Sequence, residues 1–482
     1  MKLIFEKSKS GQKGVKLPNL DVPITDFYPI PEKFMRKSEL HLPEVAENEV
    51  VRHYIKLSTK NYHIDKGFYP LGSCTMKYNP KINETTASLP GFTNIHPFQP
   101  TRTTQGALAL MYNIGEMLKE ITGLKGITLQ PSAGAHGEYT AIMMFKKYHD
   151  TKGNSHKNII LIPDSAHGTN PASVAISGLI PVNVKSDEKG MVDIKDFEEK
   201  LTDNVAGMMI TNPNTVGIFE KNIKYIADKL HEKDALLYMD GANLNALLGI
   251  VRPGDIGFDA VHINLHKTFS TPHGGGGPGS GPVAVSEKLL PHLPLPQVKI
   301  NDEGFYYLEW VNSKSIGKVH SFFGNFAILV RAYTYILMQG KEGMKEISKN
   351  AIINANYLLS KLKDHFDLPY KETPMHEFVL SGTKFKEQNV KVLDIAKRLL
   401  DYGFHAPTIY FPLIVPDALM IEPTESEPKQ RLDEFAEAMI KIKEEIYTNP
   451  DLLRNAPQNT PLKRLDDAKA AREIDVNYFK NK

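Results

Sequence analysis

Strands and helices alternate through the middle of this chain, and that alternation restricts the fold more than any other feature of the sequence. Continuous apolar runs at residues 158–163, 205–211 and 235–240 are typical of buried parallel strands. Segments with helical periodicity, such as residues 220–232, lie between these runs. The pattern predicts an α/β fold, in which a mostly parallel sheet is sandwiched between layers of helices.

Polar loops follow several of the predicted strands. They begin after Pro163, after Thr211, at Asp240, and after the strand that contains His262. The carboxyl ends of parallel strands meet at one edge of a sheet, and ligands of open α/β sheets bind outside that edge. The sequence therefore predicts a binding site there.

Lys267 ends one of these strands and precedes a loop with six glycines between Gly274 and Gly281. A lysine beside a buried strand needs its charge paired, neutralised or used covalently. The glycines allow the backbone to approach a bulky group closely. Together these features indicate an amine that forms a Schiff base with a phosphate-bearing aldehyde, pyridoxal phosphate (PLP). The alternative is a surface lysine before a flexible linker.

Asp240 ends an apolar strand 27 residues before Lys267 (267 − 240 = 27). An aspartate at this position is a candidate to pair with a protonated pyridine nitrogen, which keeps the ring electron-withdrawing. The spacing leaves room for one crossover and one strand before the lysine. The alternative role of Asp240 is to cap a helix N-terminus.

A turn of small residues, residues 132–135, follows a predicted strand and precedes a helical run at residues 139–148. Small residues at a helix N-terminus leave backbone N–H groups free for an anion such as phosphate. Ser132 adds a hydroxyl donor. The alternative is a serine-capped helix that carries a buried histidine, His136.

The chain is expected to have four parts. Residues 1–100 are proline-rich and suit a wrapping extension, and residues 101–330 form the large domain with the ligand site. Residues 331–448 form a smaller α+β domain, and residues 449–482 form a tail. An amphipathic helix is expected after Pro428.

Composition excludes several classes of protein. The 58 Lys and Arg residues nearly balance the 56 Asp and Glu residues, so no charge bias indicates nucleic acid or an anionic membrane. Cys74 is the only cysteine, which rules out an intrachain disulfide and a cysteine-rich zinc site. No secretory signal and no membrane span are recognised. We expect a cytoplasmic protein without a metal.

Six strings of residues carry a resemblance to a known family. They are Leu71-Gly-Ser-Cys-Thr-Met-Lys-Tyr-Asn79, Gln130-Pro-Ser-Ala-Gly-Ala-His-Gly-Glu138, Ser165-Ala-His-Gly-Thr-Asn-Pro171, Thr211-Asn-Pro-Asn-Thr215, Asp240-Gly-Ala-Asn243 and Asn264-Leu-His-Lys-Thr-Phe269 through Gly281. In this order they resemble the P-protein (glycine decarboxylase) of the glycine cleavage system, in particular subunit 2 of the two-subunit form.

The resemblance implies a fold-type I PLP enzyme with a smaller C-terminal α+β domain. Such an enzyme decarboxylates glycine and transfers the aminomethyl group to the lipoyl arm of H-protein. Because the fused enzyme has two homologous halves, this chain would work with a separate subunit 1, as an α2β2 assembly.

The resemblance also implies roles for individual residues. Lys267 resembles the Schiff-base lysine, Asp240 the partner of the pyridine nitrogen, and His136 the imidazole stacked on the ring. The other expected cofactor-binding residues are Ser132, Gly134, Ala135 and His266 around the phosphate, Ala242 under the ring, and Thr215. The expected border of the substrate site comprises Ser73, Cys74, Thr75, Lys77, His167, Thr169 and Asn170.

Two alternatives remain open. The chain could be another fold-type I enzyme, such as an aminotransferase or a cysteine desulfurase, although Cys74 lies early in the chain for a desulfurase nucleophile. It could also be a catalytically silent subunit that only binds partners. The presence of both Lys267 and Asp240 argues against the silent subunit.

Overall fold

The structure is a computed structural model that describes residues 1–23, 30–273 and 279–479. It divides into two compact units, residues 1–63 and 64–482. The described residues of the first unit form two 3-10 turns, η1 (Ile4–Lys7) and η2 (Glu32–Phe34), and one helix, α1 (Glu47–Ser58). An ion pair of 3.0 Å joins Lys7 to Glu49 inside this unit.

The second unit is built on a seven-stranded sheet with the order β1-β7-β6-β5-β4-β2-β3. Neighbouring strands from β3 to β6 run parallel, whereas β7 runs antiparallel to both β6 and β1. The strands are β1 (Gly126–Thr128), β2 (Ile159–Pro163), β3 (Ile180–Val184), β4 (Val205–Thr211), β5 (Leu236–Gly241), β6 (Ala260–Ile263) and β7 (Val283–Val285). The predicted mostly parallel sheet is confirmed.

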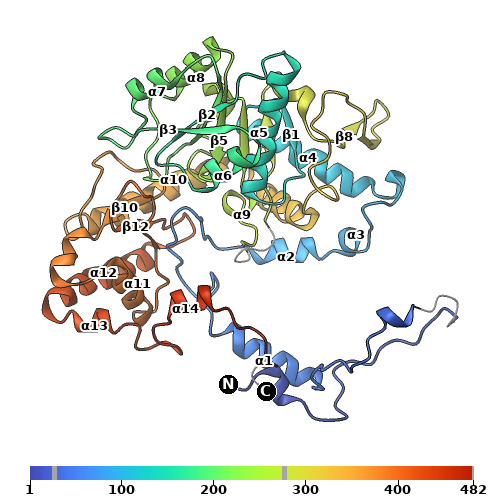
Figure 1. Cartoon of the computed structure of the whole chain (residues 1–482), viewed down its shortest axis with the longest axis vertical. Helices are drawn as coiled ribbons and strands as arrows, with labels where there is room; N and C mark the ends of the chain where they lie inside the picture. The colour runs from blue at the N-terminus through green and yellow to red at the C-terminus, as the bar shows by residue number, and fades with distance from the viewer. Residues whose placement is uncertain (24–29, 274–278, 480–482) are drawn as a thin grey trace. The chain divides into compact units, whose positions relative to one another are not determined.

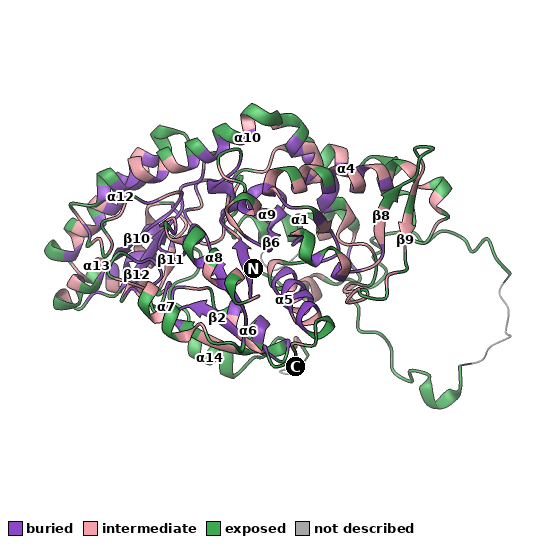
Figure 2. Cartoon of the chain, turned by 90° about the horizontal axis from the view of Figure 1, so that it is seen from above, coloured by how far each residue is buried: buried purple, intermediate pink, exposed green. Residues whose placement is uncertain are grey.

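Helices cover both faces of this sheet because side chains of each strand alternate between two cores. Met208 packs in one core with α4 (Gln105–Thr122) and α8 (Ile223–Glu232), whereas Met209 packs in the other core with α5 (Gly134–Thr151). In Figure 2 strands β2 and β6 of this sheet are coloured largely as buried, and the outer faces of the helices as exposed. The predicted sandwich follows from this alternation.

Shorter elements complete this part of the unit. They are α2 (Lys81–Ala87), α3 (Pro90–Thr93), η3 (Thr101–Thr103), α6 (Thr169–Ile176), α7 (Ile194–Lys200), η4 (Leu244–Ala246), η5 (Pro253–Ile256), α9 (Leu265–Thr268), η6 (Glu287–His292) and the hairpin of β8 (Gln297–Ile300) and β9 (Tyr306–Glu309). No helix in the described ranges combines the length and the apolar character that crossing a membrane requires.

The C-terminal part forms a second core around a small antiparallel sheet with the order β10-β12-β11 (Figure 1). A long helix, α10, leads into it and is broken at Gly340, whose φ of 60° is non-helical. The elements are α10 (Phe326–Leu362), β10 (Phe378–Ser381), η7 (Thr383–Gln388), α11 (Val392–Asp401), β11 (Thr408–Ile409), β12 (Ala418–Ile421), α12 (Lys429–Thr448), α13 (Asp451–Arg454) and α14 (Asp467–Arg472). This arrangement is the expected smaller α+β part.

The helix expected after Pro428 is α12, and its predicted apolar positions are buried. Residues 64–100 belong to the second compact unit, and Leu453, in the expected tail, is buried against the C-terminal core. The four-part division at residues 100, 330 and 448 stays a prediction of domain boundaries.

Candidate active site

A cavity of about 200 Å³ lies at the carboxyl edge of the seven-stranded sheet. Loops after β4, β5 and β6 contribute to it, together with the loop before α6, the start of α5 and a segment before α2. Its lining comprises Ser73, Cys74, Gly134, Ala135, Glu138, His167, Thr169, Thr211, Thr215, Asp240, Ala242, Asn243, His262, Asn264, His266, Lys267 and His273. The sequence predicted that the ends of these strands meet at one site, and the structure confirms that they do.

Lys267 lies in the short helix α9, immediately after β6, and only 9% of its surface is exposed. Its Nζ donates a hydrogen bond of 2.6 Å to the backbone carbonyl of Ser73. Within the described part of the chain, no carboxylate oxygen lies within 4.0 Å of this amine. The amine is therefore buried without an ion pair, as a covalent role requires. Five residues of the glycine-rich loop, 274–278, lie outside the described residues.

Asp240 ends β5 beside β6, and its carboxylate has three polar neighbours. It accepts hydrogen bonds from Asn170 Nδ2 at 3.1 Å and from the backbone N–H of Ala242 at 3.0 Å. His262 Nε2 lies 3.6 Å from Oδ1. Burial alone would raise the pKa of Asp240, but His262, the Asn170 amide and Lys267 outweigh it and hold the pKa below its usual value. This carboxylate therefore stays ionised in the cavity.

The N-terminus of α5 faces the same cavity through Gly134 and Ala135. No side chain caps this helix at Ala133, so its first N–H groups are available to an anion. A Cβ at Gly134 would come within 2.6 Å of Asn264 Oδ1, so only glycine fits this close approach. The arrangement fits the phosphate of a cofactor.

His136 and His167 differ in their relation to the cavity. His136 does not line it: the His136 ring accepts a hydrogen bond from Ser132 N–H at 3.2 Å and lies beside His320. Ala135 and Glu138 share one face of α5 because they are three residues apart, and His136 is turned off that face. His167 does line the cavity, and burial lowers its pKa.

The remaining expected cofactor residues divide in the same way. Thr215, Ala242 and His266 line the cavity, whereas Ser132 does not. Nδ1 of His266 accepts a hydrogen bond from Ser280 N–H at 3.4 Å. Burial and the neighbouring Lys267 lower the pKa of His266 to about 3, so the ring is a neutral acceptor.

The expected substrate residues lie in two layers. Ser73, Cys74, His167 and Thr169 line the cavity, whereas Asn170 lies behind it, bonded to Asp240. Burial raises the pKa of the Cys74 thiol. Thr75, Lys77 and Asn170 are not among the lining residues.

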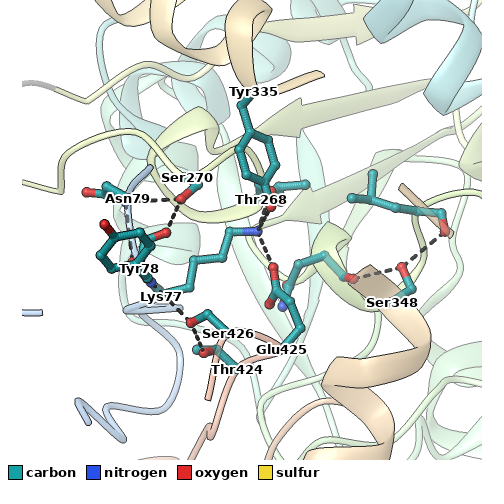
Figure 3. Close-up of polar contacts among 12 residues, drawn as sticks. Lys77, Tyr78, Asn79, Thr268, Ser270, Tyr335, Ser348, Thr424, Glu425 and Ser426 are labelled. Carbon is teal, nitrogen blue, oxygen red and sulfur yellow. Dashed lines mark hydrogen bonds and ion pairs between the residues drawn. The ribbon is translucent and has the colours of Figure 1, made fainter. Parts of the chain in front are cut away.

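Lys77 is 3% exposed and its amine is fully occupied (Figure 3). Nζ lies 2.7 Å from Glu425 Oε1 and donates to the carbonyl of Thr268 at 2.7 Å and to Tyr335 Oη at 3.3 Å. These contacts indicate a structural ion pair that supports α9, next to Lys267.

Sequence reasoning missed several residues of the site. Glu138 accepts hydrogen bonds from Thr169 at 2.8 Å and Ser173 at 2.9 Å. It ends one of the six strings that carry the family resemblance, but no role was predicted for it. His262 lies opposite Asp240 in the strand register. Its position in the strand that precedes Lys267 is the sequence feature that could have indicated a place in the site. The other missed lining residues are Thr211, Asn243, Asn264 and His273.

Comparison with known proteins agrees with this geometry. The profile of the family described as "Glycine cleavage system P-protein" matches residues 17–300, and that of "Glycine dehydrogenase, C-terminal domain" matches residues 347–464. The chain belongs to the glycine cleavage system P-protein family. A relative from Chloroherpeton thalassium, "Probable glycine dehydrogenase (decarboxylating) subunit 2", is 61% identical over 99% of this chain and 97% of its own. A relative with the same description from Caldanaerobacter subterraneus is 56% identical over 99% of each chain.

Solved structures share the fold of this P-protein family member. An inhibitor-bound glycine decarboxylase (P-protein) superposes with a TM-score of 0.72 at 19% identity, covering 86% of this chain and 93% of that one. A protein described as NifS-like superposes with a TM-score of 0.61 at 15% identity, covering 78% and 99%. The expected fold-type I architecture is confirmed.

Proposed function

We propose that this P-protein family member is the catalytic subunit of a glycine decarboxylase, with PLP as its cofactor. The observation that carries the proposal is the cavity shared by an unpaired lysine amine, Lys267, and an ionised carboxylate, Asp240. When bound, PLP supplies an aldehyde for the amine and a conjugated ring that withdraws electrons from the α-carbon of glycine. The names of the relatives in the family support glycine as the substrate.

The residues of the cavity fit the parts of this cofactor. Asp240 would accept a hydrogen bond from the protonated pyridine nitrogen, since its carboxylate is ionised. The free N–H groups at Gly134 and Ala135 would bind the phosphate. Thr211 Oγ1 and Asn264 Oδ1 are buried without a partner among the described residues, so both are available to a polar ligand.

Two residues would control orientation and proton transfer. His167 is one of the histidines that line the cavity, and its Nδ1 lies 2.9 Å from the hydroxyl of Thr169. We assign to His167 the ring contact that the family resemblance suggested for His136. The Ser73 carbonyl holds the Lys267 amine at 2.6 Å, which orients its lone pair and keeps it near the cavity for later proton transfer.

The proposal extends to partners. The relatives are described as subunit 2, which supports a working enzyme formed with a separate subunit 1, as α2β2. We propose that the lipoyl arm of H-protein accepts the aminomethyl group, with release of CO2. The cytoplasmic location stays a prediction.

Borohydride reduction of the PLP-loaded protein, followed by peptide mapping, tests the assignment of the amine. We expect the pyridoxyl label on Lys267, and a label on another lysine would contradict the assignment. Exchange of labelled bicarbonate into glycine, measured with subunit 1 and lipoylated H-protein, tests the reaction. Exchange that is absent from the complete mixture would contradict it.

The position of Cys74 in the cavity makes the desulfurase alternative directly testable. A thiol whose pKa is raised by burial is a weak nucleophile, because the thiolate is the reactive form. We therefore expect no sulfide release when cysteine replaces glycine. Sulfide release that is lost in Cys74→Ser would favour the desulfurase.

A further inference from the structure

Two buried carboxylates stand at one end of the small C-terminal sheet, beside the cavity. Glu377 immediately precedes β10 and Glu422 immediately follows β12, and the pairing of Phe378 with Ile421 brings the two glutamates together. Both are 0% exposed. An oxygen of each carboxylate and a ring nitrogen of His376 all lie within 4.8 Å of one another.

These carboxylates hold the backbone of the segment that lines the cavity. Glu377 Oε2 accepts a hydrogen bond from Ser73 N–H at 2.8 Å, and Glu422 Oε2 accepts one from Thr75 N–H at 3.0 Å. Ser73 and Thr75 have φ values of 68° and 40°. A non-glycine residue in this region costs on the order of 1 kcal/mol or more and persists only when its surroundings enforce it. The two carboxylates provide that enforcement.

The C-terminal sheet also fixes the residues that precede this segment. Leu71 forms a β-bridge with Ile421, and Gly72 N–H donates to the carbonyl of Met420 at 3.3 Å. A Cβ at Gly72 would come within 2.4 Å of the Met420 side chain, which excludes a larger residue. The sheet therefore delivers residues 71–75 to the cavity, where the Ser73 carbonyl holds the Lys267 amine.

The charges around the pair favour one retained proton. Burial raises the pKa of Glu422 to about 7, and burial together with Glu422 raises the pKa of Glu377 well above its usual value. His376 is neutral because burial lowers its pKa to about 3. Lys267 is the cation that faces both acids in the described structure, since Lys77 is paired with Glu425.

The hydrogen-bond partners of the two acids indicate which one carries the proton. Asn243 donates to both Glu377 Oε1 and the carbonyl of Pro213, so its amide orientation is fixed and Glu377 must accept. Asn245 donates to Glu422 Oε1 at 3.3 Å, but its own Oδ1 has no partner among the described residues. A turn of the Asn245 amide would let Oδ1 accept a hydrogen bond from the O–H of protonated Glu422.

We propose that Glu377 and Glu422 are positioning residues that share one proton and hold the Ser73–Thr75 segment, and through it the Lys267 amine, at the cavity. The segment then depends on a carboxylate pair in the C-terminal domain, more than 300 residues away along the chain: the separations are 304 and 347 residues. Only the tests that measure glycine turnover rest on the proposed function of the protein.

The rate of Cys74 alkylation reports the position of this segment without any assay of activity. Cys74 is the only cysteine of the chain, so peptide mapping after iodoacetamide treatment gives one rate for the PLP-loaded protein at fixed pH. In Glu422→Ala we expect a rise of at least about tenfold, together with a loss of kcat/KM for glycine of roughly 10²-fold from misplacement of the site. Glu422→Gln should restore both, because a neutral amide keeps an acceptor for Thr75.

Unfolding at different pH values tests the shared proton. The native state keeps a proton that the unfolded state loses above the ordinary glutamate pKa of 4.5, up to the native value of about 7. The unfolding constant of the wild type, relative to that of Glu422→Gln, should therefore rise about tenfold per pH unit across this window. Above the window the two unfolding constants should change with pH in parallel. Identical pH profiles for the two proteins would overturn the shared proton.

Glu427→Gln is the matched control. Burial also raises the pKa of Glu427 to about 7, but within the described structure no hydrogen bond or ion pair joins its carboxylate to residues 73–75. This variant should alter the pH profile of unfolding and leave the Cys74 rate and the KM for glycine unchanged. An unchanged Cys74 rate in a folded Glu422→Ala would overturn the positioning role. If the Cys74 and pH results hold while glycine exchange is absent, the proposed reaction fails and the positioning survives.

Discussion

Lys267 in α9 and Lys77, which contacts the end of α9, are both buried, but their amines have different partners. Lys77 is paired with Glu425 and also donates to Thr268, whereas Lys267, among the described residues, donates only to a backbone carbonyl. A buried lysine with an ion pair is satisfied by the fold alone. A buried lysine without one has an unexplained charge, and a covalent bond to an aldehyde removes it. Burial without an ion pair does not by itself identify a catalytic lysine, because Lys157 is also buried and donates to three backbone carbonyls. Lys267 differs from Lys157 because it also lines the cavity.

The largest expected effect is at the unpaired lysine. Lys267→Ala should abolish borohydride-dependent labelling by PLP and reduce bicarbonate–glycine exchange to background, because Lys267 is the one lysine among the described lining residues of the cavity. Mass spectrometry of the reduced protein and the exchange assay measure the two losses. Substantial remaining exchange would place the reactive amine elsewhere and remove the distinction between the two lysines.

The carboxylates near the two lysines should also respond differently. Asp240→Asn keeps the shape of the side chain but removes the charge that faces the cavity, so we expect kcat to fall by roughly 10²–10³-fold. Thermal unfolding should change less than in Lys77→Met, since asparagine can still accept the hydrogen bonds from Asn170 and Ala242. Unchanged turnover would show that Asp240 only caps the turn at Ala242.

Lys77→Met should act on stability instead. It leaves the largely buried carboxylate of Glu425, 10% exposed, without its ion pair, and such a loss typically costs about 3–5 kcal/mol in the free energy of unfolding. Denaturant unfolding measures the loss, and adding Glu425→Gln should recover much of it. The pyridoxyl label should stay on Lys267. A raised KM for glycine at unchanged stability would instead support the substrate role expected for Lys77 from the family resemblance.

The sequence predicted the strand-end half of the site because its geometry is local. Lys267, Asp240 and Thr215 lie at or after the ends of strands of one sheet. Parallel strand ends meet at the same edge of a sheet, so this part of the site can be predicted without knowing any tertiary contact. His136 shows the limit of this reasoning. It adjoins the turn of small residues 132–135 in sequence, but the rotation of about 100° per residue in a helix turns it away from the face that Ala135 and Glu138 share.

The C-terminal half of the site could not be predicted in this way. Glu377 and Glu422 lie in ordinary strand-flanking positions, and nothing in their neighbourhood distinguishes them from surface glutamates. Their role depends on contacts with Ser73 and Thr75 across 304 and 347 residues. Only the packing of the small sheet on the cavity brings these residues together.

The smallest expected effect is at Asn170, the residue behind Asp240. Its amide donates to the ionised carboxylate at 3.1 Å and helps to lower the pKa of Asp240. Asn170→Ala removes a hydrogen bond to a charged group, worth about 1.5–3 kcal/mol, so turnover should fall roughly tenfold to a hundredfold. Because the lost bond stabilised the charged form, the pKa of Asp240 rises, and the acidic limb of the pH–rate profile should shift to higher pH.

Asn301→Ala, in an exposed turn, is the control and should leave the profile in place. An acidic limb that stays fixed in Asn170→Ala would show that His262 and Lys267 hold Asp240 ionised without the amide.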